Sequence, residues 1–170
     1  MLGFLFRGLT AAPARGAQLF DAVTAKAREP HWYVEGKVPD TLDGRFAVLA
    51  TLAALTIVRL EQLGEAGDAQ SVALTERFIE VMESEHRELG LGDPTLGKTV
   101  RKLVGALARR TELWRSAIAG KGDWRDSAGQ SLYNAEPAAA ALNHVTAALK
   151  ALWAKLERCD LDELADGRFE

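Results

Sequence analysis

The longest apolar run in the chain covers residues 46–58, with Arg45 before it and Arg59 after it. A helix formed from such a run is apolar on every side, so it is stable in water only if other elements cover it all round. The run is well short of the roughly 20 residues that a membrane span requires. It therefore predicts a buried central helix, which we expect over residues 40–63, with the other elements packed around it.

Helical spacing of apolar residues dominates the rest of the chain. We expect further helices from Pro13 toward Pro30, over residues 69–89, from Pro94 to about Ala119, and from about Glu136 onward. Irregular connectors are expected at residues 30–39, 64–68 and 120–130. Gly90 is placed to end the helix before it in a left-handed conformation. Because no segment alternates convincingly between apolar and polar residues, the predicted fold is all-α, a single-domain bundle of five to six helices.

Two of the expected helices have an apolar face suited to packing. In the helix that starts at Pro94, an arc of about 100° contains Val100, Leu103, Leu107, Trp114 and Ile118. In the last helix, spacings of three and four alternate through Leu142, Val145, Leu149, Leu152 and Leu156. Trp114 and Trp153 lie on these faces, and we interpret them as core residues rather than as part of a cofactor site.

Length and composition are those of an ordinary soluble domain. The 170 residues carry a net charge of −3, which neither indicates nor excludes a nucleic-acid partner. Cys159 is the single cysteine and cannot form an internal disulfide, and the three histidines, His31, His86 and His144, lack the spacing of metal ligands. We expect no metal, a cytoplasmic location, a helical domain over residues 16–158 and a C-terminal tail over residues 159–170.

Residues 1–15 form a separate segment, which contains Leu2, Phe4, Leu5 and Phe6 and no acidic residue. Three interpretations stay open. In the first, the segment is a short organelle-targeting sequence, which would place a eukaryotic protein in mitochondria. In the second it touches a membrane surface, and in the third it packs on the core as a first turn.

The segment GDPTLGKT, residues 92–99, matches the phosphate-binding pattern G-x-x-x-x-G-K-[ST]. In a nucleotide-binding protein, Lys98 would reach the terminal phosphates and Thr99 would hold a magnesium ion. Such a loop follows a buried strand, whereas the residues before this segment are charged and helical in period, and Pro94 removes an amide that the loop needs. We interpret the segment as a junction between two helices, with Asp93 as the cap of the second, and expect no catalytic residue and no cofactor.

A second polar segment, VPDTLDGRF at residues 38–46, starts the central helix. Asp40 is expected to cap this helix, and Asp43 lies in its first turn, where a negative charge suits the helix dipole. Gly44 weakens a helix and so indicates close approach of another element. Arg45 needs an acidic partner near the positive end of a helix. We predict a structural network with a buried ion pair, which joins this helix start to the second hairpin, the pair of expected helices over residues 69–89 and 94–119. The network consists of Asp40, Asp43, Arg45, Arg87, Glu88 and Asp93.

Both segments belong to longer blocks: PHWYVEGKVPDTLDGRF at residues 30–46, VRL at 58–60 and RELGLGDPTLGKTVRKL at 87–103. These blocks resemble the ubiquinol–cytochrome c chaperone family, whose members carry P-x-x-Y…V-P-D-T…D-G-R-F, a downstream R-L, and R-E-x-G-V-G-D followed by G-K-K-V. The resemblance covers about residues 17–150. In its short amino end, the chain is similar to a bacterial member of the family rather than to a mitochondrial one. The chain departs from the pattern at His86, where the family commonly has an apolar residue, and at ARRTELW, which replaces a more aromatic stretch.

The resemblance implies a non-enzymatic assembly chaperone that assists maturation of cytochrome b, the haem-carrying membrane subunit of respiratory complex III. It implies cytochrome b or its nascent chain as the main partner, the ribosome or a small assembly protein as further partners, and no DNA. Two other classes stay open: a P-loop-like nucleotide-binding protein that uses GDPTLGKT, and a helical scaffold at the membrane surface.

Four basic residues lie opposite the apolar arc of the helix that starts at Pro94: Lys98, Arg101, Lys102 and Arg109, which we call the basic ridge. In one interpretation the basic ridge is a solvated helix face. In the other it binds an anionic partner, either lipid head groups on the cytoplasmic face of the inner membrane, ribosomal RNA, or acidic loops of another protein.

Overall fold

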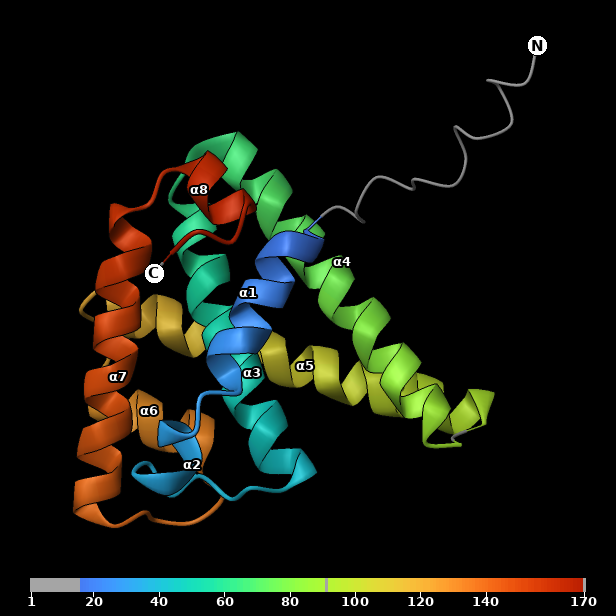
Figure 1. Ribbon diagram of the computed structural model, residues 1–170, viewed down its shortest axis with the longest axis horizontal. Coiled ribbons are helices and arrows are strands. Elements are labelled where there is room, and N and C mark those ends of the chain that lie inside the picture. Colours follow the sequence, from blue (N-terminus) through green and yellow to red (C-terminus); the bar gives the residue numbers. More distant parts are fainter. Residues whose placement is uncertain (1–15, 91, 170) are drawn as a thin grey trace.

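The structure, a computed structural model, describes residues 16–90 and 92–169, which form eight helices and no strand (Figure 1). The helices are α1 (Ala17–Ala27), α2 (His31–Val34), α3 (Leu42–Glu61), α4 (Gly64–Glu88), α5 (Asp93–Ile118), α6 (Trp124–Leu132), α7 (Ala139–Arg158) and α8 (Leu161–Ala165). Six of the eight are nine residues or longer, so the prediction of an all-α bundle of five to six helices is confirmed. Within the described ranges, no helix is long and apolar enough to cross a membrane.

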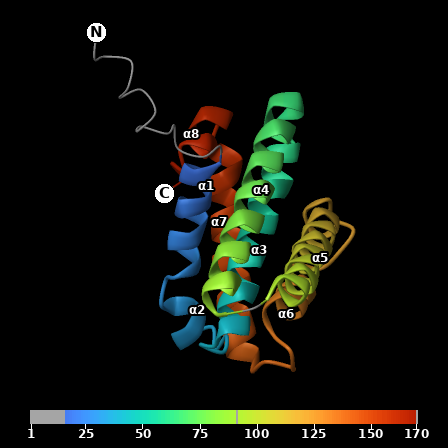
Figure 2. The ribbon, with the colours of Figure 1, turned by 90° about the vertical axis from the view of Figure 1, so that its right-hand side faces the viewer.

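Helix α3 lies in the middle of the molecule and packs against α1, α4, α5, α6 and α7 (Figures 1 and 2). Every residue from 50 to 58 is buried. The two hydroxyls in this stretch remain satisfied, because Thr51 donates to the carbonyl of Ala47 at 2.7 Å and Thr56 donates to the carbonyl of Leu52 at 2.9 Å. The prediction of a buried central helix is confirmed, with bounds slightly inside the expected ones.

The apolar faces predicted for α5 and α7 also pack inward. Trp114 is 0% exposed and Trp153 is 7% exposed, which confirms that both are core residues. Besides the two tryptophans, the buried positions among the residues predicted for these faces are Val100, Leu107, Val145, Leu149, Leu152 and Leu156. Leu103, Ile118 and Leu142 are partly buried against the same core.

The start of α3 differs by one residue from the prediction. Thr41, not Asp40, is the N-cap, since its hydroxyl accepts a hydrogen bond from the amide of Gly44 at 3.2 Å. A Cβ built on Gly44 would lie 1.8 Å from the carbonyl oxygen of Pro39, so the close approach comes from the preceding loop and not, as predicted, from another element. The turn that leads into α3 therefore folds back against the first turn of the helix.

The expected connector at residues 30–39 contains the short helix α2. Trp32 donates from its indole N–H to the carbonyl of Lys26 at 2.8 Å, and Tyr33 donates from its hydroxyl to the carbonyl of Ala27 at 2.8 Å. These carbonyls lie in the last turn of α1, where the carbonyl of Lys26 also accepts from the amide of Glu29 at 3.3 Å. The two aromatic side chains thus cap α1 and hold α2 against it.

The expected connector at residues 120–130 contains most of α6, so the prediction of an irregular segment is wrong there. Asp123 caps α6 by accepting hydrogen bonds from the amides of Arg125 and Asp126. Trp124 then packs edge-on against Trp114 of α5, with ring centroids 5.1 Å apart. A local cap and a tertiary aromatic contact together stabilise a helix of only nine residues.

Helix α4 begins at Gly64, five residues before its expected start, so GEAGD forms its first turn instead of a connector. A Cβ on Gly67 would lie 2.0 Å from the carbonyl oxygen of Leu60, and glycine therefore lets the start of α4 lie against the end of α3. At the other end, Gly90 has a φ of 84°, which confirms the predicted left-handed terminator.

The ends of the chain also differ from the expectations. Helix α1 begins at Ala17, and Pro13, with the rest of residues 1–15, lies outside the described residues. The last helix of the expected set begins at Ala139, three residues later than predicted. The segment expected as a C-terminal tail contains α8, and its Leu164 and Phe169 are 0% and 2% exposed, so it contributes to the core.

Two arginines satisfy the carboxyl ends of other helices. Arg59, at the end of α3, donates to the carbonyls of Leu156, Glu157 and Cys159 at 3.0–3.2 Å, where α7 ends. Arg110 of α5 donates to the carbonyl of Ser131 near the end of α6 at 2.8 and 3.2 Å. Both pairings place a positive charge where the helix dipole is negative.

We predict that Arg59→Ala lowers the free energy of unfolding by about 1.5–3 kcal/mol, because it removes charge-assisted hydrogen bonds from three carbonyls. Arg45→Ala is the matched control at the other end of α3. Its side chain is 66% exposed in an ion pair with Asp40, so the melting temperature should stay close to that of the parent. Thermal and urea unfolding measure both effects. Equal melting temperatures for the two variants would contradict the capping role of Arg59.

Candidate functional site

A groove of about 430 Å³ lies between α4 and α5, and the end of α3 forms its floor. In Figures 1 and 2, α4 and α5 come close together at the turn that joins them and diverge from there. The groove between the diverging helices is lined by Ile57 and Glu61 of α3, Ser71, Val72, Thr75 and Glu76 of α4, and Val104, Leu107, Ala108, Thr111 and Arg115 of α5.

The walls of the groove are largely apolar. Ile57 and Leu107 connect it to the core at 6% and 3% exposure, whereas Val72 is 55% exposed on the α4 wall. Together these side chains give the groove an apolar surface that is open to solvent along the α4 wall.

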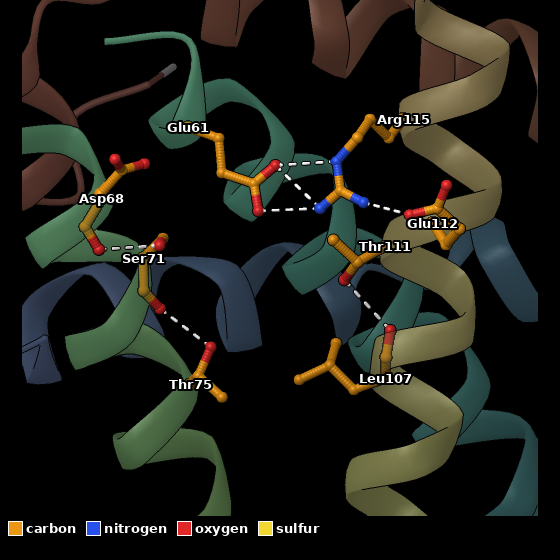
Figure 3. A network of polar contacts seen from close by, with 8 residues as sticks. All are labelled: Glu61, Asp68, Ser71, Thr75, Leu107, Thr111, Glu112 and Arg115. Carbon is orange, nitrogen blue, oxygen red and sulfur yellow. Dashed lines mark hydrogen bonds and ion pairs between the residues drawn. The ribbon is translucent and has the colours of Figure 1, made fainter. Parts of the chain in front are cut away.

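The hydroxyl groups in the groove are already satisfied within their own helices (Figure 3). Ser71 donates to the carbonyl of Asp68 at 2.8 Å, Thr75 donates to that of Ser71 at 2.9 Å, and Thr111 donates to that of Leu107 at 3.1 Å. A hydroxyl that already donates a hydrogen bond inside its own helix does not need a hydrogen-bond acceptor from a ligand. These residues therefore allow an apolar ligand to lie over them without losing a hydrogen bond.

Charged groups close one end of the groove. Arg115 donates from Nε to Glu61 at 3.1 Å and from Nη2 to the other oxygen of the same carboxylate at 2.9 Å, and it also pairs with Glu112 (Figure 3). Partial burial lowers the pKa of Arg115, but its hydrogen bonds to Glu61 and the charges of both carboxylates more than offset this, so the pKa is raised. The bidentate pair links the end of α3 to α5 and fixes the rim.

The sequence analysis missed this groove. Its only local signal is Val72, an apolar residue on a helix with seven acidic residues and two arginines. Nothing in the sequence spacing shows that α4 and α5 diverge, because the angle between two helices depends on tertiary packing.

The four residues of the basic ridge lie together on the exposed side of α5. Arg101 donates to the carbonyl of Gly97 at 3.1 Å, and no ion pair involves the ridge within the described part of the chain. At about 100° per residue, the ridge stands roughly 120° around α5 from the groove wall. The basic ridge is therefore centred on a different side of α5 from the groove, and only Arg101 lies next to the groove wall, near Val104 and Ala108.

The predicted polar network is brought together only in part. Asp40 and Arg45 form an ion pair at 2.6 Å, which holds the pKa of the Asp40 carboxyl below its usual value through the hydrogen bond from Arg45. The prediction of a buried pair is wrong, because the two side chains are 57% and 66% exposed. Asp40 lies just before α3 and Arg45 lies in its first turn, so the two side chains pair locally and no residue of another element takes part.

The remaining members of that network lie elsewhere. Asp43 is exposed in the first turn of α3, and Arg87 and Glu88 are exposed in the last turn of α4. Asp93 is the first residue of α5 and Gly92 is its N-cap, so the prediction that Asp93 caps this helix is wrong. Among the described side chains, no hydrogen bond or ion pair joins Arg87 or Glu88 to Arg45.

GDPTLGKT forms the junction of two helices, as predicted. It follows α4 rather than a strand, Pro94 lies in the first turn of α5, and Lys98 is exposed one turn later. The backbone amides that would surround phosphate in a P-loop are instead part of a continuous helix. Among the described residues, no group of three or more His, Cys, Asp or Glu is arranged to hold a metal ion.

The comparisons with known proteins agree with the motifs. The family model described as ubiquinol-cytochrome C chaperone matches residues 34–170. The crystal structure of the Cbp3 homolog from Brucella abortus is similar in fold, with a TM-score of 0.77 and 23% identity over 100% of this chain and 96% of that chain. No curated protein matches the sequence.

We predict no saturable binding of ATP or GTP in the presence of magnesium, because the segment that matches the phosphate pattern is helical. Titration of a labelled nucleotide into the full chain measures this, with Lys98→Ala as the control. A micromolar dissociation constant that Lys98→Ala abolishes would contradict the assignment.

Proposed function

Because the chain belongs to the ubiquinol-cytochrome C chaperone family, we propose that it is a non-enzymatic chaperone that assists maturation of cytochrome b during assembly of respiratory complex III. The observation that carries this proposal is the apolar groove between α4 and α5. Cytochrome b is a membrane subunit, so its segments expose apolar side chains until they are inserted and assembled. A chaperone for such a client needs an apolar surface that is accessible from water.

The shape of the groove limits what it holds. Its volume of about 430 Å³ lies within the range of pockets that enclose part of a ligand. It accommodates a few anchoring side chains of one apolar segment, not a whole transmembrane helix. Three helices form its walls and floor, and an amphipathic helix or an extended segment can place its apolar side in such a groove. Each 100 Å² of apolar surface that is covered contributes about 2.5 kcal/mol before the costs of association.

The two walls differ in charge. Helix α4 has seven acidic residues against two arginines, whereas α5 has six basic residues against two acidic ones. A client segment that carries charge at its ends is therefore oriented by the field across the groove. Charge selects the direction of binding, and apolar burial supplies the affinity.

We further propose that the protein works at the cytoplasmic face of the inner membrane, held there by the basic ridge. The ridge is exposed, and on average it lies roughly 120° around α5 from the groove wall. Each Lys or Arg close to an anionic membrane surface contributes up to about 1 kcal/mol. Docking through the ridge would leave the groove accessible to a client.

The groove is tested by placing a carboxylate in it. We predict that Val72→Glu reduces the recovery of cytochrome b with the chaperone about tenfold or more, because covering an unpaired carboxylate costs more than 1.4 kcal/mol. Val34→Glu is the matched control: Val34 is exposed to a similar extent, 57% against 55%, but lies on α2 outside the groove. The measurement is purification of the full chain from native membranes, with cytochrome b quantified in the eluate. Undiminished recovery with a folded Val72→Glu variant would refute the groove as the client site.

The basic ridge is tested by charge reversal. We predict that changing Lys98, Arg101, Lys102 and Arg109 to Glu abolishes co-sedimentation with anionic lipid vesicles at low salt. The control variant has the same net charge as the ridge variant, because four other exposed basic residues are changed to Glu: Arg28, Lys121, Lys150 and Arg158. The ridge is only a solvated face if both variants sediment as the parent does. Loss of ribosome binding with retained vesicle binding would assign the ridge to RNA.

A further inference from the structure

Three titratable side chains lie in a row where α2 meets α7. Nδ1 of His31 is 3.1 Å from Nε2 of His144, although 113 positions separate the two histidines in the sequence. On its other side, Nε2 of His31 is 3.2 Å from a carboxylate oxygen of Glu29. His31 is 31% exposed and Glu29 is 40% exposed, so solvent and ions reach the row.

The carboxylate of Glu29 decides which nitrogen of His31 carries the proton. A carboxylate only accepts hydrogen bonds, so neutral His31 donates to it from Nε2, and its Nδ1 has a free lone pair. Nδ1 is the nitrogen of His31 that lies next to Nε2 of His144. A carboxylate that accepts the outer N–H of a histidine is the arrangement that orients and activates histidine ligands in metal sites.

We propose that His31 and His144 form a two-histidine site for a divalent transition-metal ion, with Glu29 as the residue that positions His31. When His144 carries its proton on Nδ1, both facing nitrogens present lone pairs. With metal–nitrogen bonds of about 2.0–2.1 Å, a separation of 3.1 Å corresponds to an angle of roughly 98° at the metal. This value lies between the angles of square-planar and tetrahedral coordination.

The same spacing selects the kind of metal. Two nitrogens in opposite axial positions, as in a bis-histidine haem, would be about 4 Å apart, so the pair matches neighbouring positions on a small ion. Imidazole pairs suit copper, nickel and zinc, and affinity is greatest for Cu²⁺. Because no third His, Cys, Asp or Glu of the described residues completes the set, water fills the other positions and the ion is exchangeable.

A bound ion would fasten α2 to α7. His31 precedes Trp32, which caps the end of α1 and packs in the core, and the two rings lie with centroids 4.3 Å apart. Metal binding to the folded chain stabilises it by mass action. The site is independent of the groove and of the proposed function.

The experiment is titration of the full chain with Cu²⁺ at neutral pH, followed by calorimetry and by electron paramagnetic resonance. We expect saturable binding of one ion with hyperfine structure from two nitrogens. Glu29→Gln should weaken binding about 10–100-fold, the range for loss of such an orienting residue. His144→Gln, which keeps a hydrogen-bonding side chain at this position, and His31→Ala should abolish it. His86→Ala is the control and should bind as the parent does.

A further measurement keeps the proposal open to refutation. The titration is repeated with Cys159→Ser, which should bind equally well. No saturable binding by the parent, equal affinity in His144→Gln, or binding that disappears with Cys159→Ser would overturn the proposal, and the two histidines would then only hydrogen-bond each other.

Discussion

The structure depends on the requirement that α3 be covered on every side. Its apolar residues from 50 to 58 are all buried, and five other helices provide the cover. Because α4 and α5 both pack on α3 but cross it in different directions, they cannot also stay in contact with each other along their full lengths (Figure 1). The groove is the result, and the buried helix itself supplies the groove floor through Ile57.

Polar interactions then fix how the covering helices end. Arg59 and Arg110 satisfy the last carbonyls of α7 and α6, and Arg115 joins α5 to Glu61 at the end of α3. In each case one long cationic side chain joins two helices. Without this link, apolar packing alone would let the two helices shift relative to each other along their axes. The pair of Arg115 and Glu61 therefore gives the rim of the groove a defined shape.

The candidate site was predictable from the sequence only in part. Periodicity along one helix placed Lys98, Arg101, Lys102 and Arg109 on a single exposed side, and it correctly separated that side from the core. The same reasoning failed for Arg45, whose partner is Asp40 five residues away at the surface, not a residue of the second hairpin. It also gave no indication that His31 and His144 meet, because contacts between distant residues do not follow from local spacing.

The sequence by itself determined the all-α class, the buried central helix, the left-handed end at Gly90 and the helical junction at GDPTLGKT. Each of these follows from side-chain periodicity or from a backbone preference that acts within a few residues. Only the tertiary structure decided that Trp124 packs on Trp114 and so makes a helix of a predicted connector. The divergence of α4 and α5 was decided in the same way, because the angle between helices depends on how all the side chains at their contacts fit together at once.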